Sequence, residues 1–358
     1  MRLLTLLAGL GLAACSPGEG AATPAKGQDT PGAEAATAAA GLPGETRAFR
    51  DWIAICDNGA ACFAYGRGSE GMGWIRVAME PGPDARPEVA AGYWPEEAER
   101  SRTFALTIDR VDYPMTLADN EPVAAEVPAA RALEVVRALA DGETARIGAE
   151  HELSLSGAAA ALLWIDERQG RVGTVTALRR AGSRPASAVP AAPPQPVVAP
   201  APAAPQDGFG DQNQILPAAL EVLPAVVECR AETADHWVGK EIMAARLDAS
   251  TELWAVPCFA GAYNMGHDWY VTGPGGRDPR PAVLVSTSDE PTAGTINGGY
   301  SPESRTLTAF AKGRGVGDCG TASTWTWTGR AFVLTSEMAM TECWGVPPDY
   351  WPTTWRTR

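Results

Sequence analysis

The stretch from Ala181 to Gln206 constrains the fold most, because its sequence, AGSRPASAVPAAPPQPVVAPAPAAPQ, consists largely of proline and alanine. Such a composition favours an extended polyproline II conformation and acts as a semi-rigid spacer. It predicts a linker over residues 181–206 that separates a first body, residues 47–180, from a second body, residues 207–358. Residues 15–46 are rich in Ala, Gly, Pro and Thr and contain no aromatic residue, so they predict a disordered tether.

The N-terminus indicates export from the cytoplasm. Met1-Arg2 is a short positive region, and the apolar run that follows it is too short to span a bilayer as a helix. Residues 1–14 therefore predict a secretory signal peptide. Small residues precede Cys15, an arrangement that resembles the bacterial lipobox and predicts lipidation of Cys15; an ordinary cleavage site beside a chance cysteine is the alternative. Two or three acyl chains give stable membrane anchoring, and Ser16 favours the outer membrane.

The other six cysteines form an even set, which in an oxidising compartment predicts disulfides. Nearest neighbours in sequence predict Cys56–Cys62, Cys229–Cys258 and Cys319–Cys343, although the four cysteines of the second body allow three connectivities. A redox centre of the Cys-x-x-Cys type does not fit the Cys56–Cys62 spacing. A metal site would need further ligands, and the three histidines are widely spread: His151, His236 and His267.

The segment RDWIAICDNGAACFAYG, residues 50–66, predicts a β-hairpin whose register follows the hydrophobic pattern. A two-residue Asn-Gly turn would place Cys56 opposite Ala61, out of register with Cys62. A wider loop centred on Gly59 pairs Cys56 with Cys62 and keeps Ile53, Ile55, Phe63 and Tyr65 on one face. Cysteines opposed in a strand pair are close enough to form a disulfide. The sequence therefore predicts a disulfide across a wider hairpin loop.

Other elements of the first body are indicated by periodicity. A strand is predicted over 101–110, where Phe104, Leu106 and Ile108 alternate with polar residues. Apolar positions at helical spacing predict a helix over 128–142, and residues 157–169 predict a short helix. A last strand is predicted over 171–178.

Short strands with Gly- and Pro-rich turns dominate the second body, after a helical start at 216–230 that Pro217 and Pro224 interrupt. They predict an antiparallel sandwich or barrel-like sheet. Trp325 and Trp327 must point to the same side of a strand; they either fill the core or form an exposed aromatic platform for binding a glycan or peptide. The predicted strands are 252–258, 281–287, 305–312, 323–329 and 330–338.

The net charge and the absence of known catalytic motifs limit the classes of function that we expect. The formal net charge is −14, which argues against binding nucleic acid through a basic surface. The sequence contains no Gly-x-Ser-x-Gly, His-Glu-x-x-His or phosphate-loop motif, and it indicates neither a cofactor nor a metal site. A catalytic carboxylate pair could be formed among Asp109, Asp112, Asp166 and Glu167, but solvated surface charge is the simpler interpretation.

Several blocks together carry a resemblance to a known family. FRDWIAICDNGAACFAYG, LSLSGAAAALLWIDERQGRVGTVTAL, VPCFAGAYN, KGRGVGDCG, WTWTGRAFVL and WPTTWR resemble successive blocks of the proteobacterial family known as domain of unknown function 1176. The first body also resembles, more distantly, the invasion-associated locus B family of secreted or periplasmic proteins. That resemblance implies an immunoglobulin-like β-sandwich for residues 47–180, and supplies no catalytic residues.

We therefore expect a mainly β protein with a few short helices (α+β), built from two antiparallel sandwich-like domains. The expected function is that of a non-catalytic lipoprotein on the periplasmic face of the outer membrane, acting as a binding or interaction module. Its expected partners are the membrane, through the N-terminal lipid, and an envelope protein or cell-wall glycan. Alternatives are a hydrolase inhibitor, a glycan-binding protein, or an enzyme with an unrecognised carboxylate site.

Overall fold

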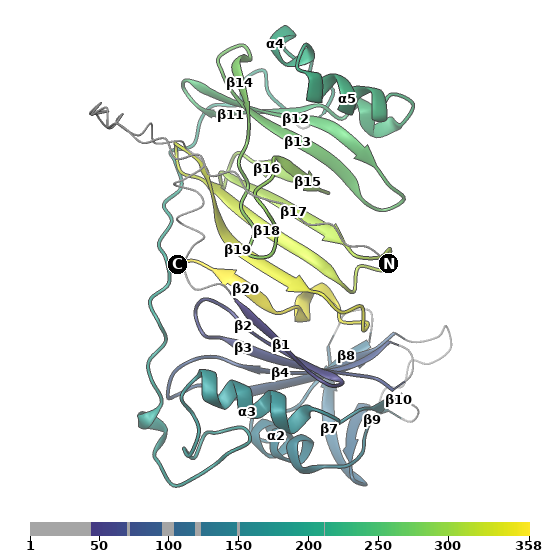
Figure 1. Ribbon diagram of the computed structural model, residues 1–358, viewed down its shortest axis with the longest axis vertical. Helices are drawn as coiled ribbons and strands as arrows, with labels where there is room; N and C mark the ends of the chain where they lie inside the picture. The colour runs from purple at the N-terminus through teal and green to yellow at the C-terminus, as the bar shows by residue number, and fades with distance from the viewer. Residues whose placement is uncertain (1–43, 70–71, 95–103, 119–122, 149–150, 211) are drawn as a thin grey trace, which may run out of the picture.

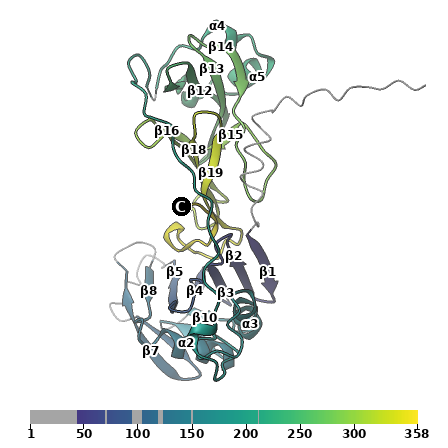
Figure 2. The ribbon, with the colours of Figure 1, turned by 90° about the vertical axis from the view of Figure 1, so that its left-hand side faces the viewer.

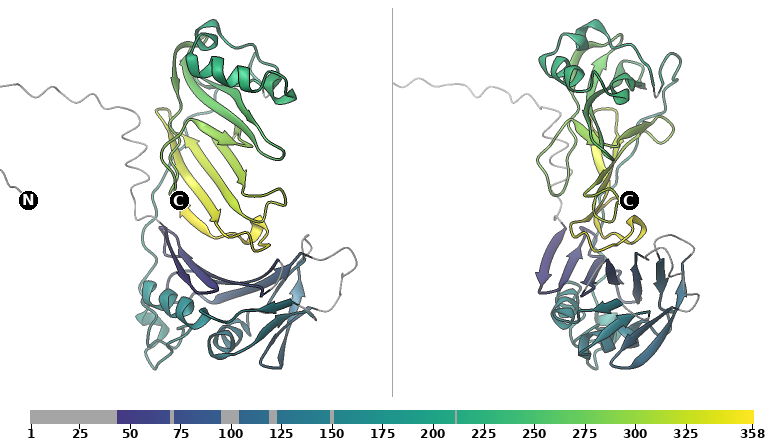
Figure 3. Two further views of the ribbon diagram at one scale, coloured as in Figure 1. Left: turned by 45° about the vertical axis from the view of Figure 1, so that its right-hand side comes forward. Right: turned by 90° about the vertical axis from the view of Figure 1, so that its right-hand side faces the viewer.

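The computed structural model describes residues 44–69, 72–94, 104–118, 123–148, 151–210 and 212–358. Over these residues the protein is mainly antiparallel β-sheet with a few short helices, which confirms the expected fold class. Figure 1 and Figure 3 show an elongated molecule, with the first body at one end and two further sheets stacked beyond it. Among the described helices, none combines the length and apolar character needed to cross a bilayer.

The first body contains a ten-stranded sheet in the order β1-β2-β3-β4-β5-β8-β7-β6-β9-β10, with helices α2 (Ala132–Asp141) and α3 (Ala158–Arg168) packed against it. A bridge between Gly68 and Leu153 brings the last strand of the order back toward the middle of the sheet. The sheet thus folds over a large apolar core with both helices at its side. Its strands are β1 (Glu45–Phe49), β2 (Trp52–Cys56), β3 (Cys62–Arg67), β4 (Gly73–Met79), β5 (Pro87–Tyr93), β6 (Phe104–Ile108), β7 (Val111–Leu117), β8 (Val123–Glu126), β9 (Ala145–Ile147) and β10 (His151–Leu153).

The hairpin of β2 and β3 has the predicted register. Cys56 is paired with Cys62, and Ile53 with Tyr65, so the loop between them is wider than two residues. Trp52 and the disulfide face the core of the first body, whereas Ile53 and Tyr65 face the opposite side. Both faces of this hairpin are therefore buried, which the alternating pattern alone did not predict.

The second body contains two five-stranded sheets that share one apolar core. Asn297, in the connection between the sheets, donates from Nδ2 to the carbonyl oxygen of Phe310 at 2.9 Å and accepts at Oδ1 from the Met265 amide at 2.9 Å. Helices α4 (Ala218–Glu221) and α5 (Pro224–Glu232) cover the outer face of the first of these sheets (Figure 1). The strands are β11 (Met243–Asp248), β12 (Thr251–Ala260), β13 (Met265–Gly273), β14 (Arg277–Pro281) and β15 (Gly294–Ile296), then β16 (Gly299–Ser301), β17 (Thr306–Lys312), β18 (Gly320–Trp327), β19 (Phe332–Met340) and β20 (Thr353–Arg356).

A third apolar core joins the two bodies. The Tyr65 hydroxyl donates to the carbonyl oxygen of Tyr350 at 2.6 Å, and the Tyr350 ring packs at 5.1 Å from that of Trp74. Elsewhere in the contact between the two bodies, the Trp94 indole donates to the carbonyl oxygen of Gly345 at 2.8 Å. Burying large aromatic residues across this contact makes the two bodies one packed unit.

The disulfide-closed loop between β2 and β3 contacts the last strand of the chain. The Asn58 side chain donates to the Arg356 carbonyl oxygen and accepts from the Arg356 amide, both at 2.8 Å, as a neighbouring strand would. The buried Asp57 carboxylate accepts from the amides of Gly59 and Ala61 at 2.8 Å and pairs with the Arg356 guanidinium. The loop therefore covers the edge of β20, which would otherwise present unpaired backbone groups.

The Pro/Ala segment between the bodies lies along one side of the molecule, as Figures 1 and 2 show. It forms neither α-helix nor strand, as its composition predicts. It is nevertheless packed: Val189 and Ala201 are buried, the Ala201 amide donates to the Trp327 carbonyl oxygen at 2.9 Å, and Pro196 accepts from the Arg358 amide at 2.8 Å. The segment is thus a strap held against both bodies and not a free spacer.

Two predicted strands are wrong. Residues 171–178 form turns, because the buried Arg171 guanidinium donates to the carbonyl oxygens of Glu80 and Gly82 and fixes the chain locally. Within residues 281–287, Pro281 ends strand β14 and Leu284 forms an isolated bridge to Thr292, but no further strand is present. Ala282 and Leu284 are buried because the segment crosses over the core shared by the two sheets, whereas Val283 is exposed.

Candidate functional site

A polar cavity of about 640 Å³ opens on the first body beside the β6–β7 hairpin. The hairpin turn forms one wall, the start of β9 and the residues before it form a second, and the segment that follows β10 forms the floor. Carboxylates, guanidinium groups and hydroxyls dominate the lining. Its residues are Ser69, Thr107, Asp109, Arg110, Asp112, Glu143, Thr144, Ala145, Arg146, Glu152, Leu153, Ser154, Leu155 and Ser156.

The turn that borders this cavity has an unusual backbone. Asp109 (φ 45°) and Arg110 (φ 72°) both lie in the left-handed region, between paired residues Ile108 and Val111. Two successive positive φ angles match the right-handed twist of a hairpin but normally favour Asn, Asp or Gly, so Arg110 is the unusual residue of the turn. Non-glycine residues in this region store strain and are concentrated at functional sites.

The Asp109 carboxylate holds that turn in place. It accepts from the amides of Thr144 at 2.9 Å and Glu143 at 3.0 Å, and from the Thr144 hydroxyl at 3.2 Å. These bonds, first those from the backbone of Thr144 and Glu143, lower the pKa of Asp109 below its usual value. Asp109 is therefore an ionised anchor that fixes the position of the neighbouring Arg110.

The cavity floor is fixed from beneath. The Ser154 hydroxyl donates to the Asp51 carboxylate at 2.7 Å, and the buried Trp52 indole donates to the Ser154 carbonyl oxygen at 2.8 Å. Across the β6–β7 hairpin the Thr107 hydroxyl donates to Asp112 at 2.7 Å. Walls that are already hydrogen-bonded need little ordering when a ligand enters.

The four carboxylates singled out from the sequence fall into two places. Asp109 and Asp112 line the cavity together. Asp166 is buried at the end of α3, where it accepts from the amides of Leu178, Arg179 and Arg180 at 2.7 to 3.0 Å, and Glu167 is exposed on the same helix. Asp166 therefore holds the turn that was expected to be a strand, and it has no place in the cavity.

The aromatic platform expected as one possibility at Trp325 and Trp327 is not exposed. Their side chains are 5% and 2% exposed and belong to the core between the two sheets of the second body. The Trp325 indole donates to the Val285 carbonyl oxygen at 2.7 Å. Both residues point to the same side, as the strand period requires, but that side faces another sheet, so the platform interpretation is wrong.

All three predicted disulfides are present: Cys56–Cys62, Cys229–Cys258 and Cys319–Cys343. Cys15, the predicted lipidation site, lies outside the described residues. Two aspartates lie close to disulfides, Asp268 beside Cys229–Cys258 and Asp318 beside Cys319–Cys343. In each group the sulfur atoms are joined to one another, so they present no thiolate to a metal ion.

Some residues of the site gave no signal in the sequence. Arg110 and Arg146 both line the cavity, and Glu143 and Glu152 add carboxylates from segments distant in sequence from the β6–β7 turn. Their spacing follows no periodic pattern. The one usable signal was the polar pair Asp109-Arg110 between two alternating strands, which is typical of a two-residue turn.

Comparison with known proteins identifies relatives over most of the chain. A sequence model of the family described as "Protein of unknown function (DUF1176)" matches residues 46–358. "Uncharacterized protein YpfG" of Escherichia coli (strain K12) is 30% identical over 336 residues, which cover 87% of this chain and 93% of that protein. The crystal structure of invasion associated protein B from Bartonella henselae matches 35% of this chain and 99% of that chain, with 14% identity and a TM-score of 0.28.

Proposed function

The chain belongs to the DUF1176 family of unknown function, and from that premise we propose that it is a non-catalytic binding module of the cell envelope. In this proposal the cavity beside the Asp109-Arg110 turn is the binding site. The observation that carries the proposal is the strained turn locked by Asp109, because such strain persists where the surrounding structure holds it and is common at ligand sites.

The state of Asp109 favours binding over hydrolysis. A pair of catalytic carboxylates needs one member whose pKa is raised, so that it can donate a proton near neutral pH. The pKa of Asp109 is lowered by backbone amides, and the same bonds occupy its oxygens. Such a group orients and attracts a ligand but is a poor general acid.

The chemistry of the lining favours a peptide-like ligand. Arg110 and Arg146 can hold a carboxylate, and Asp112 and Glu152 can hold an amine, while hydroxyls supply further hydrogen bonds. No aromatic ring lines the cavity among the described residues, so stacking against a sugar face is not provided. We assign to it the peptide part of a cell-wall glycan or a polar peptide segment of an envelope protein.

The binding prediction can be measured with a soluble mixture of cell-wall muropeptides by isothermal titration. Replacing Arg110 and Arg146 together by Glu reverses two charges at the cavity, and we expect the affinity to fall at least about tenfold, as for loss of a charge-assisted hydrogen bond. The matched control replaces Arg277 and Arg280 together by Glu, two exposed arginines on the edge strand β14. Equal affinity of the double variant and the control would contradict the assignment, and turnover of the muropeptides by the unaltered protein would favour an enzyme.

We further propose that the protein is held at the outer membrane by acylation of Cys15, facing the periplasm. The N-terminal sequence supports this, and three disulfides suit an oxidising compartment. In the variant Cys15→Ser, we expect the protein to move from the membrane pellet to the soluble fraction, because the acyl chains supply the membrane affinity. Immunoblots of fractionated cells measure this, with Ser16→Ala as control; retention of Cys15→Ser in the pellet would refute lipid anchoring.

A further inference from the structure

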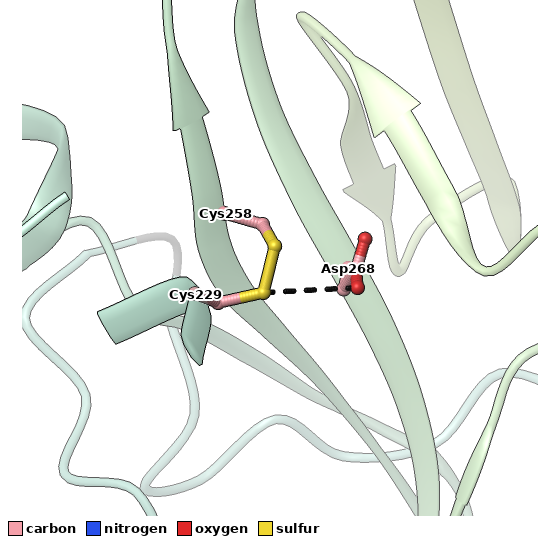
Figure 4. Close-up of side chains that lie close together, drawn as sticks. All are labelled: Cys229, Cys258 and Asp268. Atoms are coloured by element: carbon pink, nitrogen blue, oxygen red, sulfur yellow. Dashed lines mark hydrogen bonds between the residues drawn. A yellow bond between two sulfur atoms is a disulfide. The ribbon is translucent and has the colours of Figure 1, made fainter. Parts of the chain in front are cut away.

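The disulfide Cys229–Cys258 lies beside the carboxylate of Asp268, which pairs with no Arg or Lys in the described part of the chain. Cys229 belongs to α5, Cys258 to β12 and Asp268 to β13, and Figure 4 shows the three side chains converging. The Asp268 Oδ2 atom lies 3.8 Å from Sγ of Cys229. The disulfide thus joins the covering helix to the sheet at a point where a proton-exchanging group is in reach of one sulfur.

The three disulfides differ in how far a thiol can reach them. Both sulfur-bearing residues of Cys56–Cys62 are buried, at 1% and 0% exposure. In Cys229–Cys258, Cys229 is 3% exposed whereas Cys258 is only half-buried, so Cys258 is the more accessible residue of the pair. In thiol–disulfide exchange one sulfur is attacked and the other leaves. The difference in exposure assigns Cys258 as the attacked sulfur and Cys229 as the leaving sulfur.

The third disulfide provides a contrast. Cys343 is exposed and Cys319 is buried, and Asp318 lies close by, so the arrangement is superficially similar. However, Arg314 donates to both oxygens of Asp318, and the Gly345 amide donates to it at 2.7 Å. Asp318 is therefore committed to an ion pair and cannot exchange a proton with a sulfur.

Asp268 differs from Asp318 in its charged neighbours. No Arg or Lys pairs with it among the described residues, and burial raises its pKa above the usual value. The pKa of Tyr270, two residues along the same strand, is raised mainly by burial of its ring and further by the charge of Asp268. A carboxyl group with a raised pKa can both carry a proton and accept one.

We propose that Cys229–Cys258 is a redox-active disulfide that exchanges with a dithiol partner, with Cys258 as the attacked sulfur and Asp268 exchanging a proton with Cys229. One partner thiolate forms a bond to Sγ of Cys258, the Cys229–Cys258 bond breaks, and its electron pair goes to Cys229, which takes the proton of Asp268. The second partner thiolate then attacks the partner sulfur of the mixed disulfide and releases Cys258 as a thiolate, which takes a proton from solvent. The partner is oxidised to a disulfide and loses two protons, while the cysteine pair is reduced by two electrons and, with Asp268 reprotonated, becomes a dithiol.

The test follows the reverse reaction in the full-length protein. After native reduction with dithiothreitol, the protein is re-oxidised with glutathione disulfide, quenched by alkylation and mapped by mass spectrometry. We expect Cys229–Cys258 to open without unfolding and glutathione to attach at Cys258. In Asp268→Asn, which cannot accept the Cys229 proton, the mixed disulfide should resolve at least about tenfold more slowly. The control Asp278→Asn, an exposed aspartate on β14, should resolve at the unaltered rate.

Several results would overturn the proposal. These are a pair that opens only on unfolding, glutathione attached first at Cys229, or an Asp268→Asn variant that resolves at the unaltered rate. Two further variants keep the proposal testable if Asp268→Asn does not fold. Cys229→Ser should retain the adduct at Cys258, because the resolving thiol is gone, whereas Cys258→Ser should leave the buried Cys229 unmodified; modification of Cys229 there would contradict the assignment of the sulfurs.

Discussion

Replacing Arg356 by Met is expected to lower the free energy of unfolding by about 3 kcal/mol, since a buried charge that loses its partner is strongly destabilising. The Asp57 side chain is fully buried, and its pKa is raised by burial, with the charge of Arg356 opposing that shift. Arg356 also pairs with Glu80 at 3.2 Å, so its loss weakens the contact between the two bodies at two points. Urea unfolding followed by tryptophan fluorescence and circular dichroism measures the change.

The matched variant Asp57→Asn should behave differently. Asparagine keeps the oxygen that accepts from the amides of Gly59 and Ala61, but removes the buried charge. Arg356 is partly exposed and can be hydrated when unpaired, so we expect a loss below about 1 kcal/mol. Adding Asp57→Asn to Arg356→Met should restore most of the lost stability. If the free energy of unfolding of Arg356→Met alone stays within about 0.5 kcal/mol of that of the unaltered protein, as for a surface substitution, the Asp57–Arg356 pair does not stabilise the contact between the two bodies.

Gly157→Ala is expected to destabilise the protein by about 4 kcal/mol, combining backbone strain with a steric clash. Gly157 precedes α3 with φ 108°, a conformation that residues with a Cβ rarely adopt. An added Cβ would lie 1.7 Å from the carbonyl oxygen of Phe49, so α3 and β1 would have to separate. Thermal unfolding should show a large drop in the midpoint temperature.

Gly82→Ala separates the two contributions. Gly82 also has a positive φ, 95°, but an added Cβ would meet no atom within 4 Å. Only the strain remains, and we expect a loss of about 1 kcal/mol. Equal effects of Gly157→Ala and Gly82→Ala would show that the close approach of β1 to the start of α3 is not a feature of the native fold.

The sequence predicted best those features that depend on neighbouring residues. The register of the β2–β3 hairpin follows from the alternation of Ile53, Ile55, Phe63 and Tyr65, because a shift by one residue would move every side chain to the other face. The helix expected over 128–142 is present as α2, ending before Gly142. Proximity along the chain likewise gave the disulfide pairs, since each links the nearest available cysteine.

Features that depend on distant segments could not be predicted in the same way. The strand expected over 281–287 has the right apolar pattern, yet Leu284 lies in the core between two sheets and pairs only through an isolated bridge to Thr292. Trp325 and Trp327 share a face as predicted, but only the position of the other sheet decides that this face is buried. The contact between Asn58 and Arg356 spans most of the chain and carries no local pattern.

The same limit applies to the candidate site. Asp109 and Arg110 could be recognised as a hairpin turn, because polar residues interrupt two alternating strands. The backbone amides of Glu143 and Thr144, which fix Asp109, come from the connection between α2 and β9. Those bonds lower the pKa of Asp109, and they could be identified only from the folded arrangement.

The most direct measurement of the central claim is backbone amide chemical-shift mapping while the protein is titrated with the soluble muropeptide mixture. The account predicts that the largest shifts arise in two segments that border the cavity, residues 107–112 and 143–146. They should saturate together, because both walls contact one ligand. Saturating shifts confined to other surfaces, or none in these two segments at the highest ligand concentration, would contradict the assignment of this cavity as the binding site.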